Sequence, residues 1–242
     1  MAGQVSLDLL VTGIVALAGI MRGVTGFGGA MLMTPPLSML LGAVPAVVIS
    51  LCLEAAAALI MVPATYRDLP VRQFALLIVP ACLAIPVGTQ LLIGFDPVVA
   101  RRLIGAMVVI SSLAMLSGLR YVRQPPTSLF VGVGTLAGVL LGATGIGAPP
   151  VILFLLSGPG AARNTRAILT AFISMTSFIG LAALLASGAI TVPLMQWSGL
   201  LAVVFLAGIL IGMKVFAHLS DLGTRTIALC LMLLLGVAAL VV

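Results

Sequence analysis

The chain carries one short pattern twice, as Gly19-Ile-Met-Arg-Gly-Val-Thr-Gly-Phe-Gly-Gly29 and as Gly138-Val-Leu-Leu-Gly-Ala-Thr-Gly-Ile-Gly-Ala148. Four glycines and one threonine match at a constant offset of 119 residues. Glycine is a poor helix former, so we expect both apolar segments to break here. In hydrocarbon, a broken backbone is tolerated only where it is buried in protein or lines a cavity. Two breaks at equivalent positions are typical of a site between two repeats.

The composition places the chain in a lipid bilayer. Of its 242 residues, 62% are hydrophobic and 7% are charged, and the mean hydropathy is +1.38. A soluble domain needs a polar exterior, which this composition does not supply. The net charge is +6, but the eleven Lys and Arg are scattered through short loops. Because they form no basic patch, binding to nucleic acid is not expected.

Ten apolar segments follow one another without a long linker, which predicts one membrane domain over residues 1–242. Two of the segments are too short to cross, since a crossing needs about 20 helical residues. These two, 30–41 and 149–157, come directly after the glycine breaks. The ten segments are 7–21, 30–41, 44–62, 73–93, 98–118, 127–143, 149–157, 165–186, 193–213 and 225–242.

The repeat extends beyond the glycines, which predicts an internal duplication. Further matches occur in the same order, and their offset rises slowly, as small loop insertions would cause. They are Ser50 with Thr170, Pro70 to Phe74 with Pro193 to Trp197, Gly88 with Gly212, and Arg101 with Arg225. We expect repeat 1 to cover residues 1–122 and repeat 2 to cover residues 123–242.

The basic residues favour two inverted repeats. If each break and its short segment form a re-entrant hairpin, each half has one hairpin and three crossings. Eight basic residues then share one side, whereas Arg101 and Arg102 lie opposite, which suits the positive-inside rule. The eight are Arg67, Arg72, Arg120, Arg123, Arg163, Arg166, Lys214 and Arg225. An odd number of crossings inverts the second half and puts both termini outside. In an alternative topology, the chain also crosses the membrane at each short segment. This gives an odd number of crossings in each half as well, and the alternative is left open.

Two motifs resemble the TauE/SafE family of sulfite and organosulfonate exporters. They are the first glycine pattern with the Met31-Leu-Met-Thr-Pro35 that follows it, and Gly145-Ile-Gly-Ala-Pro-Pro-Val-Ile-Leu153. The resemblance covers nearly the whole chain. It implies an inner-membrane permease for small anionic sulfur compounds or organic acids. The chain departs from the family pattern at Ala148 and at Ile49-Ser50.

The residues at the two breaks are candidates for binding a substrate. Unwound backbone here would present N–H groups, and each following helix start adds partial positive charge. Thr25 and Thr144 place one hydroxyl beside each break, and they either donate to an anion or satisfy freed carbonyls. The remaining candidates at the breaks are Gly26, Phe27, Gly28 and Gly29 in the first copy and Gly145, Ile146 and Gly147 in the second.

Two charged residues fall in apolar sequence close to the first break. Glu54 lies deep in its segment, with Ser174 as its repeat counterpart, and it is a candidate for carrying a coupling proton. Arg22 has Leu141 as its counterpart. It either attracts an anion, pairs with Glu54 or reaches an interface. Ser50 and Ser174 complete the set of candidate substrate-binding residues.

These observations predict a secondary transporter in the cell inner membrane that exports small anions such as sulfite or sulfonates. Alternating access would occur at a midplane site between the repeats. The alternatives are an uptake permease or channel for another small solute, and a membrane subunit without transport activity. No Ser–His, Cys–His or clustered His/Asp/Glu arrangement indicates an enzyme, a metal site or a cofactor. Proton coupling and homo-oligomer formation are left open.

Overall fold

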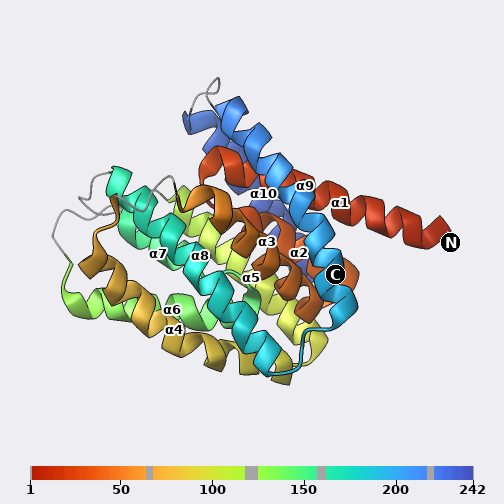
Figure 1. Ribbon diagram of the computed structural model, residues 1–242, viewed down its shortest axis with the longest axis horizontal. Helices are drawn as coiled ribbons and strands as arrows, with labels where there is room; N and C mark the ends of the chain where they lie inside the picture. The colour runs from red at the N-terminus through yellow and green to blue at the C-terminus, as the bar shows by residue number, and fades with distance from the viewer. Residues whose placement is uncertain (1, 64–67, 118–124, 157–161, 217–220, 242) are drawn as a thin grey trace.

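The fold consists of helices that correspond one to one with the ten predicted segments. The computed structural model describes residues 2–63, 68–117, 125–156, 162–216 and 221–241, and every regular element within them is an α-helix (Figure 1). The predicted all-α membrane fold is thereby confirmed. In chain order the helices are α1 (Ala2–Thr25), α2 (Gly29–Leu41), α3 (Ala43–Met61), α4 (Val71–Gly94), α5 (Pro97–Leu116), α6 (Thr127–Thr144), α7 (Ala148–Leu156), α8 (Ala162–Ala186), α9 (Val192–Phe216) and α10 (Asp221–Val241).

Helix lengths divide these elements into long and short ones. In the part of the chain that the structure describes, seven helices are long and apolar enough to cross a membrane. By contrast, α2 has 13 residues and α7 has nine, which at 1.5 Å per residue is about 20 and 14 Å. Helix α1 is longer than the predicted 7–21, because it continues through the polar residues before Leu9. Its first part projects beyond the other helices in Figure 1.

The chain folds back at each glycine break. Gly26 and Gly145 have φ values of +77° and +72°, a left-handed conformation that favours glycine. Gly147 then lies against the helix it has just left, since a Cβ atom there would stand 2.5 Å from the Ala137 carbonyl oxygen. Ala137 lies two helical turns before the break. The short helices therefore start beside the ends of α1 and α6, as a fold-back hairpin requires.

The tightest helix pairs join the two halves of the chain. Helix α1 packs on α9, and α4 packs on α6. A Cβ atom on Gly19 or Gly23 would collide with a carbonyl oxygen of α9, and Gly138 and Gly142 stand in the same relation to α4. In each pair, the glycines are four residues apart and lie on one helix face, which lets the backbones of the two packed helices approach each other closely. In both pairs the contacting residue numbers rise together, so the paired helices run parallel.

Helices α2 and α3 form a hairpin around a single residue, Gly42, whose φ is +89°. Polar contacts cross this hairpin at equal distances from the turn. The hydroxyls of Thr34 and Ser50 are 2.8 Å apart, and one turn further from Gly42 the Ala30 amide donates to Glu54 at 3.1 Å. The hairpin therefore holds Glu54 against the first turn of α2.

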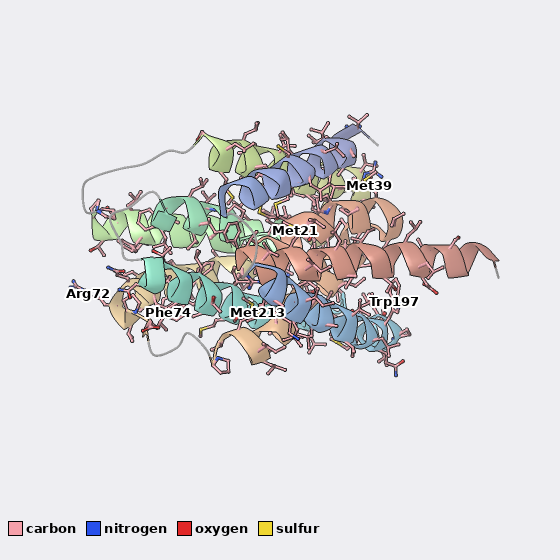
Figure 2. The ribbon with its side chains drawn as sticks, turned by 90° about the horizontal axis from the view of Figure 1, so that it is seen from above. Met21, Met39, Arg72, Phe74, Trp197 and Met213 are labelled. Atoms are coloured by element: carbon pink, nitrogen blue, oxygen red, sulfur yellow. The ribbon has the colours of Figure 1, made fainter. Side chains whose placement is uncertain are left out.

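Helices α4 and α9 begin at opposite ends of the molecule. Figure 2 shows Arg72 and Phe74, in the first turn of α4, at one end. Trp197, near the start of α9, lies toward the other end. Of the basic residues that predict the sidedness of the chain, Arg67, Arg120 and Arg123 lie outside the described residues.

Candidate functional site

The two glycine breaks meet at one small cavity in the middle of the bundle. Its volume is about 20 Å³, which is room for about one water molecule. Both halves contribute to its wall, from α2 and α3 on one side and from the second break and α8 on the other. The lining residues are Gly28, Ala30, Met31, Glu54, Leu141, Gly145, Ile146, Gly147, Ala148, Ile173 and Ser177.

Helix α3 shows how close the two breaks lie to each other. The second break packs on Val47, since a Cβ atom on Gly145 would be 3.3 Å from Val47 Cγ1. The first turn of α2 contacts Glu54, seven residues further along α3. At 1.5 Å per residue, the two contacts are about 10 Å apart along the helix. Both contacts therefore fall within the N-terminal two thirds of α3.

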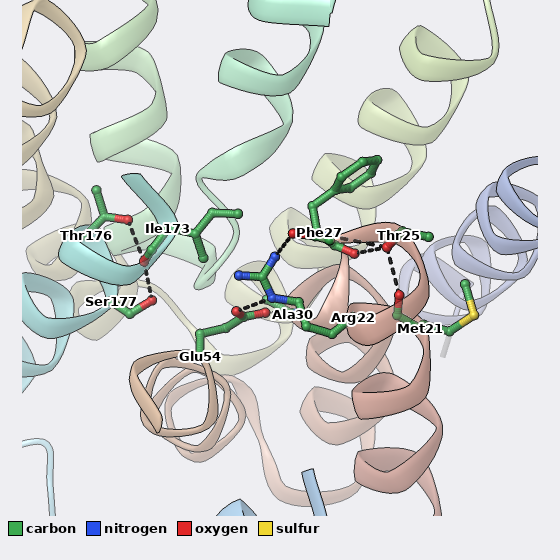
Figure 3. A network of polar contacts seen from close by, with 10 residues as sticks. Met21, Arg22, Thr25, Phe27, Ala30, Glu54, Ile173, Thr176 and Ser177 are labelled. Atoms are coloured by element: carbon green, nitrogen blue, oxygen red, sulfur yellow. Dashed lines mark hydrogen bonds and ion pairs between the residues drawn. The ribbon is translucent and has the colours of Figure 1, made fainter. Parts of the chain in front are cut away.

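A buried ion pair borders the cavity. Arg22 Nε lies 2.9 Å from Glu54 Oε2, and the two side chains are 1% and 4% exposed. Arg22 also donates through Nη1 to the carbonyl oxygen of Gly26, whose backbone the first break has freed. Figure 3 shows the guanidinium between this carbonyl and Glu54. Of the alternatives for Arg22, the structure shows the pairing with Glu54.

Gly29 leaves the space in which this pair sits. A Cβ atom there would lie 2.7 Å from Glu54 Oε1 and 3.0 Å from Phe205 Cζ of α9. The Glu54 carboxylate consequently reaches the backbone amide of Ala30 in the first turn of α2. Glu54 thus uses both of its oxygens: Oε1 accepts from the Ala30 amide, and Oε2 forms the ion pair with Arg22. The amide belongs to a helix start, where partial positive charge also favours an anion.

The two threonines make matching local contacts. Thr25 Oγ1 is within hydrogen-bonding distance of two carbonyl oxygens, that of Met21 at 2.8 Å and that of Phe27, and its single O–H donates to one of them. It also lies 3.4 Å from the Phe27 amide. Thr144 Oγ1 donates to the Leu140 carbonyl at 2.7 Å and accepts from the Ile146 amide at 3.2 Å. Of their two predicted uses, satisfying backbone groups at the break is the one that the structure shows.

The other predicted residues divide between the cavity wall and its surroundings. Gly28, Gly145, Ile146 and Gly147 line it. Gly26 and Phe27 form the turn itself, and Ser50 bonds to Thr34 on the α2–α3 hairpin.

On α8, the lining includes Ser177 and not Ser174, although the Ser174 hydroxyl is buried and has no hydrogen-bond partner among the described residues. Ser177 Oγ donates to the Ile173 carbonyl at 2.7 Å. An offset of 123, which already matches Pro70 with Pro193, aligns Glu54 with Ser177. That later offset is the signal that could have found Ser177.

A multi-pass helical bundle with two broken helices, and with charged groups where they break, has the architecture of a membrane transporter. The family model described as sulfite exporter TauE/SafE matches residues 11–239. The chain therefore belongs to the TauE/SafE family, a family of transporters and not of enzymes, as its two glycine motifs predict. No match was found among curated proteins or among solved structures.

Proposed function

We propose that the chain is a secondary transporter in the plasma membrane that exports small oxyanions, such as sulfite, sulfonates or related organic acids. One observation carries this proposal: both glycine breaks, the start of α2 and the buried Arg22–Glu54 pair converge on a single cavity. Apart from a ligand site, nothing in a helical bundle requires two breaks and an ion pair at one place. A subunit without transport activity would leave this convergence unexplained.

The charges of the site suit an anion and come from the first half of the chain. Arg22 and the first-turn amide of Ala30 are the donors, and a guanidinium combined with a helix start is a common anion-binding arrangement. At the position equivalent to Arg22, the second half has Leu141, which lines the opposite wall. We therefore expect the substrate anion to sit nearer to α2 than to α7.

The cavity is too small for such an anion, so binding requires the site to open. About 20 Å³ holds roughly one water molecule, whereas sulfite has four heavy atoms. The proposed motion is alternating access between two bodies. Because the closest backbone contacts pair α1 with α9 and α4 with α6, each body contains helices from both repeats.

Inverted repeats remain part of the proposal. They are supported by the opposite starting ends of α4 and α9 (Figure 2) and by the parallel packing of α1 with α9 and of α4 with α6. Single cysteines at positions 67, 102 and 166, in a variant without other cysteines, test the sidedness with a membrane-impermeant thiol reagent. We expect positions 67 and 166 on the cytoplasmic side and position 102 outside. Labelling of 67 and 166 from opposite sides would contradict inversion.

Transport is tested with purified protein in liposomes. Labelled sulfite, sulfoacetate and dicarboxylates are offered with and without a proton gradient, and flux is followed in both directions. We expect at least one of these anions to move, and Gly26→Leu or Gly145→Leu to abolish the flux. If none of the anions moves, the transporter proposal is rejected. If both leucine variants express and leave the flux unchanged, the site between the breaks is rejected.

A further inference from the structure

The Glu54 carboxylate occupies the donors that an anionic substrate would use. Its Oε2 is 2.9 Å from Arg22 Nε, and its Oε1 accepts from the Ala30 amide at 3.1 Å. Figure 3 shows both contacts converging on this one side chain. Glu54 and Ala30 also line the cavity between the two breaks. An anion that enters the cavity and binds to Arg22 and the Ala30 amide must therefore displace the carboxylate that already contacts them.

We propose that Glu54 is a tethered competitor of the transported anion, so that each monovalent anion binds together with one proton taken up by Glu54. The inference rests on the proposed function and adds to it the coupling ion, the ratio and a restriction on the substrate. In the empty site Glu54 is ionised and holds Arg22. In the loaded site the anion holds Arg22, and Glu54 is a neutral acid.

The charge balance of the buried site explains why a proton must accompany the anion. An anion that took over Arg22 would leave an unpaired carboxylate at a position where Glu54 is 3% exposed, which is strongly unfavourable. A proton from a hydronium ion removes that charge: one O–H bond of the hydronium breaks, the carboxylic O–H bond forms, and the transported anion keeps all of its covalent bonds. Empty and loaded sites then carry the same net charge for a monovalent anion.

Arg22 is the cation that contacts Glu54 among the described residues. Helix α2 carries no titratable side chain. The arginines and lysine of the helices packed on α3 stand near helix ends: Arg72 of α4, Arg101 and Arg102 of α5, Arg163 and Arg166 of α8, and Lys214 of α9. The other titratable groups on α3 and on these helices are Cys52 of α3 and Cys82 of α4, and α1, which carries Arg22, also has Asp8.

The two contacts of Glu54 also restrict the substrate. The carboxylate bridges Arg22 and Ala30 with two oxygens attached to one carbon atom. A replacement must present two oxygens on one central atom, as sulfite, sulfonates and carboxylates do. A halide offers a single atom and would leave one donor unpaired. We therefore expect chloride to compete weakly at this site.

Coupling of this kind is reciprocal, because anion binding favours protonation and protonation favours anion binding. The anion and the proton cross together without net charge. Such a carrier exports an anion that accumulates inside the cell, and an acidic exterior opposes that export. At equilibrium, one pH unit balances about a tenfold anion gradient when one proton accompanies one anion.

The closing experiment uses methanesulfonate, which stays ionised in the assay and cannot carry the proton itself. Proteoliposomes are loaded with a pH indicator, and labelled methanesulfonate flux is measured together with proton flux. For the wild type we expect one proton per methanesulfonate, and about tenfold accumulation for an imposed gradient of one pH unit. Glu54→Gln should still exchange methanesulfonate across the membrane, but it should no longer accumulate it in response to a pH gradient.

Asp96→Asn is the matched control, because it removes an exposed carboxylate at the α5 N-cap and keeps a good capping residue. It should behave as the wild type. Methanesulfonate flux without proton flux in the wild type would overturn the inference, as would pH-driven accumulation by Glu54→Gln. If the wild type exchanges neither sulfite nor methanesulfonate, the proposed function fails and the inference falls with it. The wild-type measurement decides the matter even if Glu54→Gln does not fold.

Discussion

Removing one member of the Arg22–Glu54 pair should destabilise the protein far more than removing both. The pair is 2.9 Å apart and at most 4% exposed, so neither Arg22→Met nor Glu54→Gln leaves the remaining charge in water. Breaking a buried pair in this way costs about 3–5 kcal/mol. For a chain of this length, we expect the midpoint of thermal unfolding to fall by roughly 6–20 °C in each single variant.

The double variant Arg22→Met/Glu54→Gln leaves no isolated charge at the site. We therefore expect it to be more stable than either single variant, with a coupling free energy on the order of 3 kcal/mol. The assay is thermal unfolding of purified protein in detergent at one fixed scan rate, because irreversible unfolding makes the midpoint depend on that rate. Arg102→Gln is the control, since Arg102 is exposed and its loss should change stability by less than about 0.5 kcal/mol. Additive losses in the double variant would refute the buried pairing.

Three further substitutions test the backbone of the breaks and the helix packing. Gly145→Ala should cost more than about 1–2 kcal/mol, because φ is +72° and Val47 Cγ1 would be 3.3 Å from the new Cβ; the midpoint of thermal unfolding measures this loss. Gly142→Leu should prevent accumulation of folded protein, measured by size-exclusion chromatography, because its Cβ would meet backbone atoms of α4, Thr89 N among them at 2.6 Å. Thr144→Val should cost about 1–3 kcal/mol in the same unfolding assay, because the Ile146 amide loses its hydroxyl acceptor.

Each of these variants has a matched control elsewhere in the chain. Gly188→Ala shares a positive φ of +73° but has nothing within 4 Å of the new Cβ, so it should show the backbone cost alone. Gly132 also has nothing within 4 Å, and Gly132→Leu should fold. Thr135→Val removes an exposed hydroxyl bound to its own helix and should be nearly neutral. Equal effects in a variant and its control would contradict the packing described for that position.

Most of the helical framework could be predicted because it depends on local features of the chain. The lengths of the apolar segments determine which helices can cross, and the glycines of the twin motif mark where α1 and α6 end. Every segment end predicted from the sequence lies within five residues of the observed helix end. The largest difference is the start of α1, where polar residues outside the apolar run continue the helix.

The site itself depends on contacts between residues far apart in the chain, and here the sequence left alternatives open. Arg22 could pair with Glu54, bind an anion or reach an interface, and the choice requires the α2–α3 hairpin to bring Glu54 back to the end of α1. Because the repeat offset drifts along the chain, its value at the nearest preceding match aligns Glu54 with Ser174 and not with Ser177. Ser174 and Ser177 are three residues apart, which is nearly one helical turn. They therefore lie on about the same face of the helix, so the drift changes the residue that is predicted but not the face.

The packing of α1 on α9 and of α4 on α6 also constrains the synthesis of the protein. Helix α1 emerges first from the ribosome, but α9, on which it packs through Gly19 and Gly23, emerges nearly last. The glycine-lined face of α1 therefore has no packing partner in the membrane until α9, and with it almost the whole chain, has been made. An N-terminal half released early would hold α1 and α4 without their partners. We therefore expect the α4–α6 pair to form once the middle of the chain has been made, and the α1–α9 pair to form only near the end of synthesis.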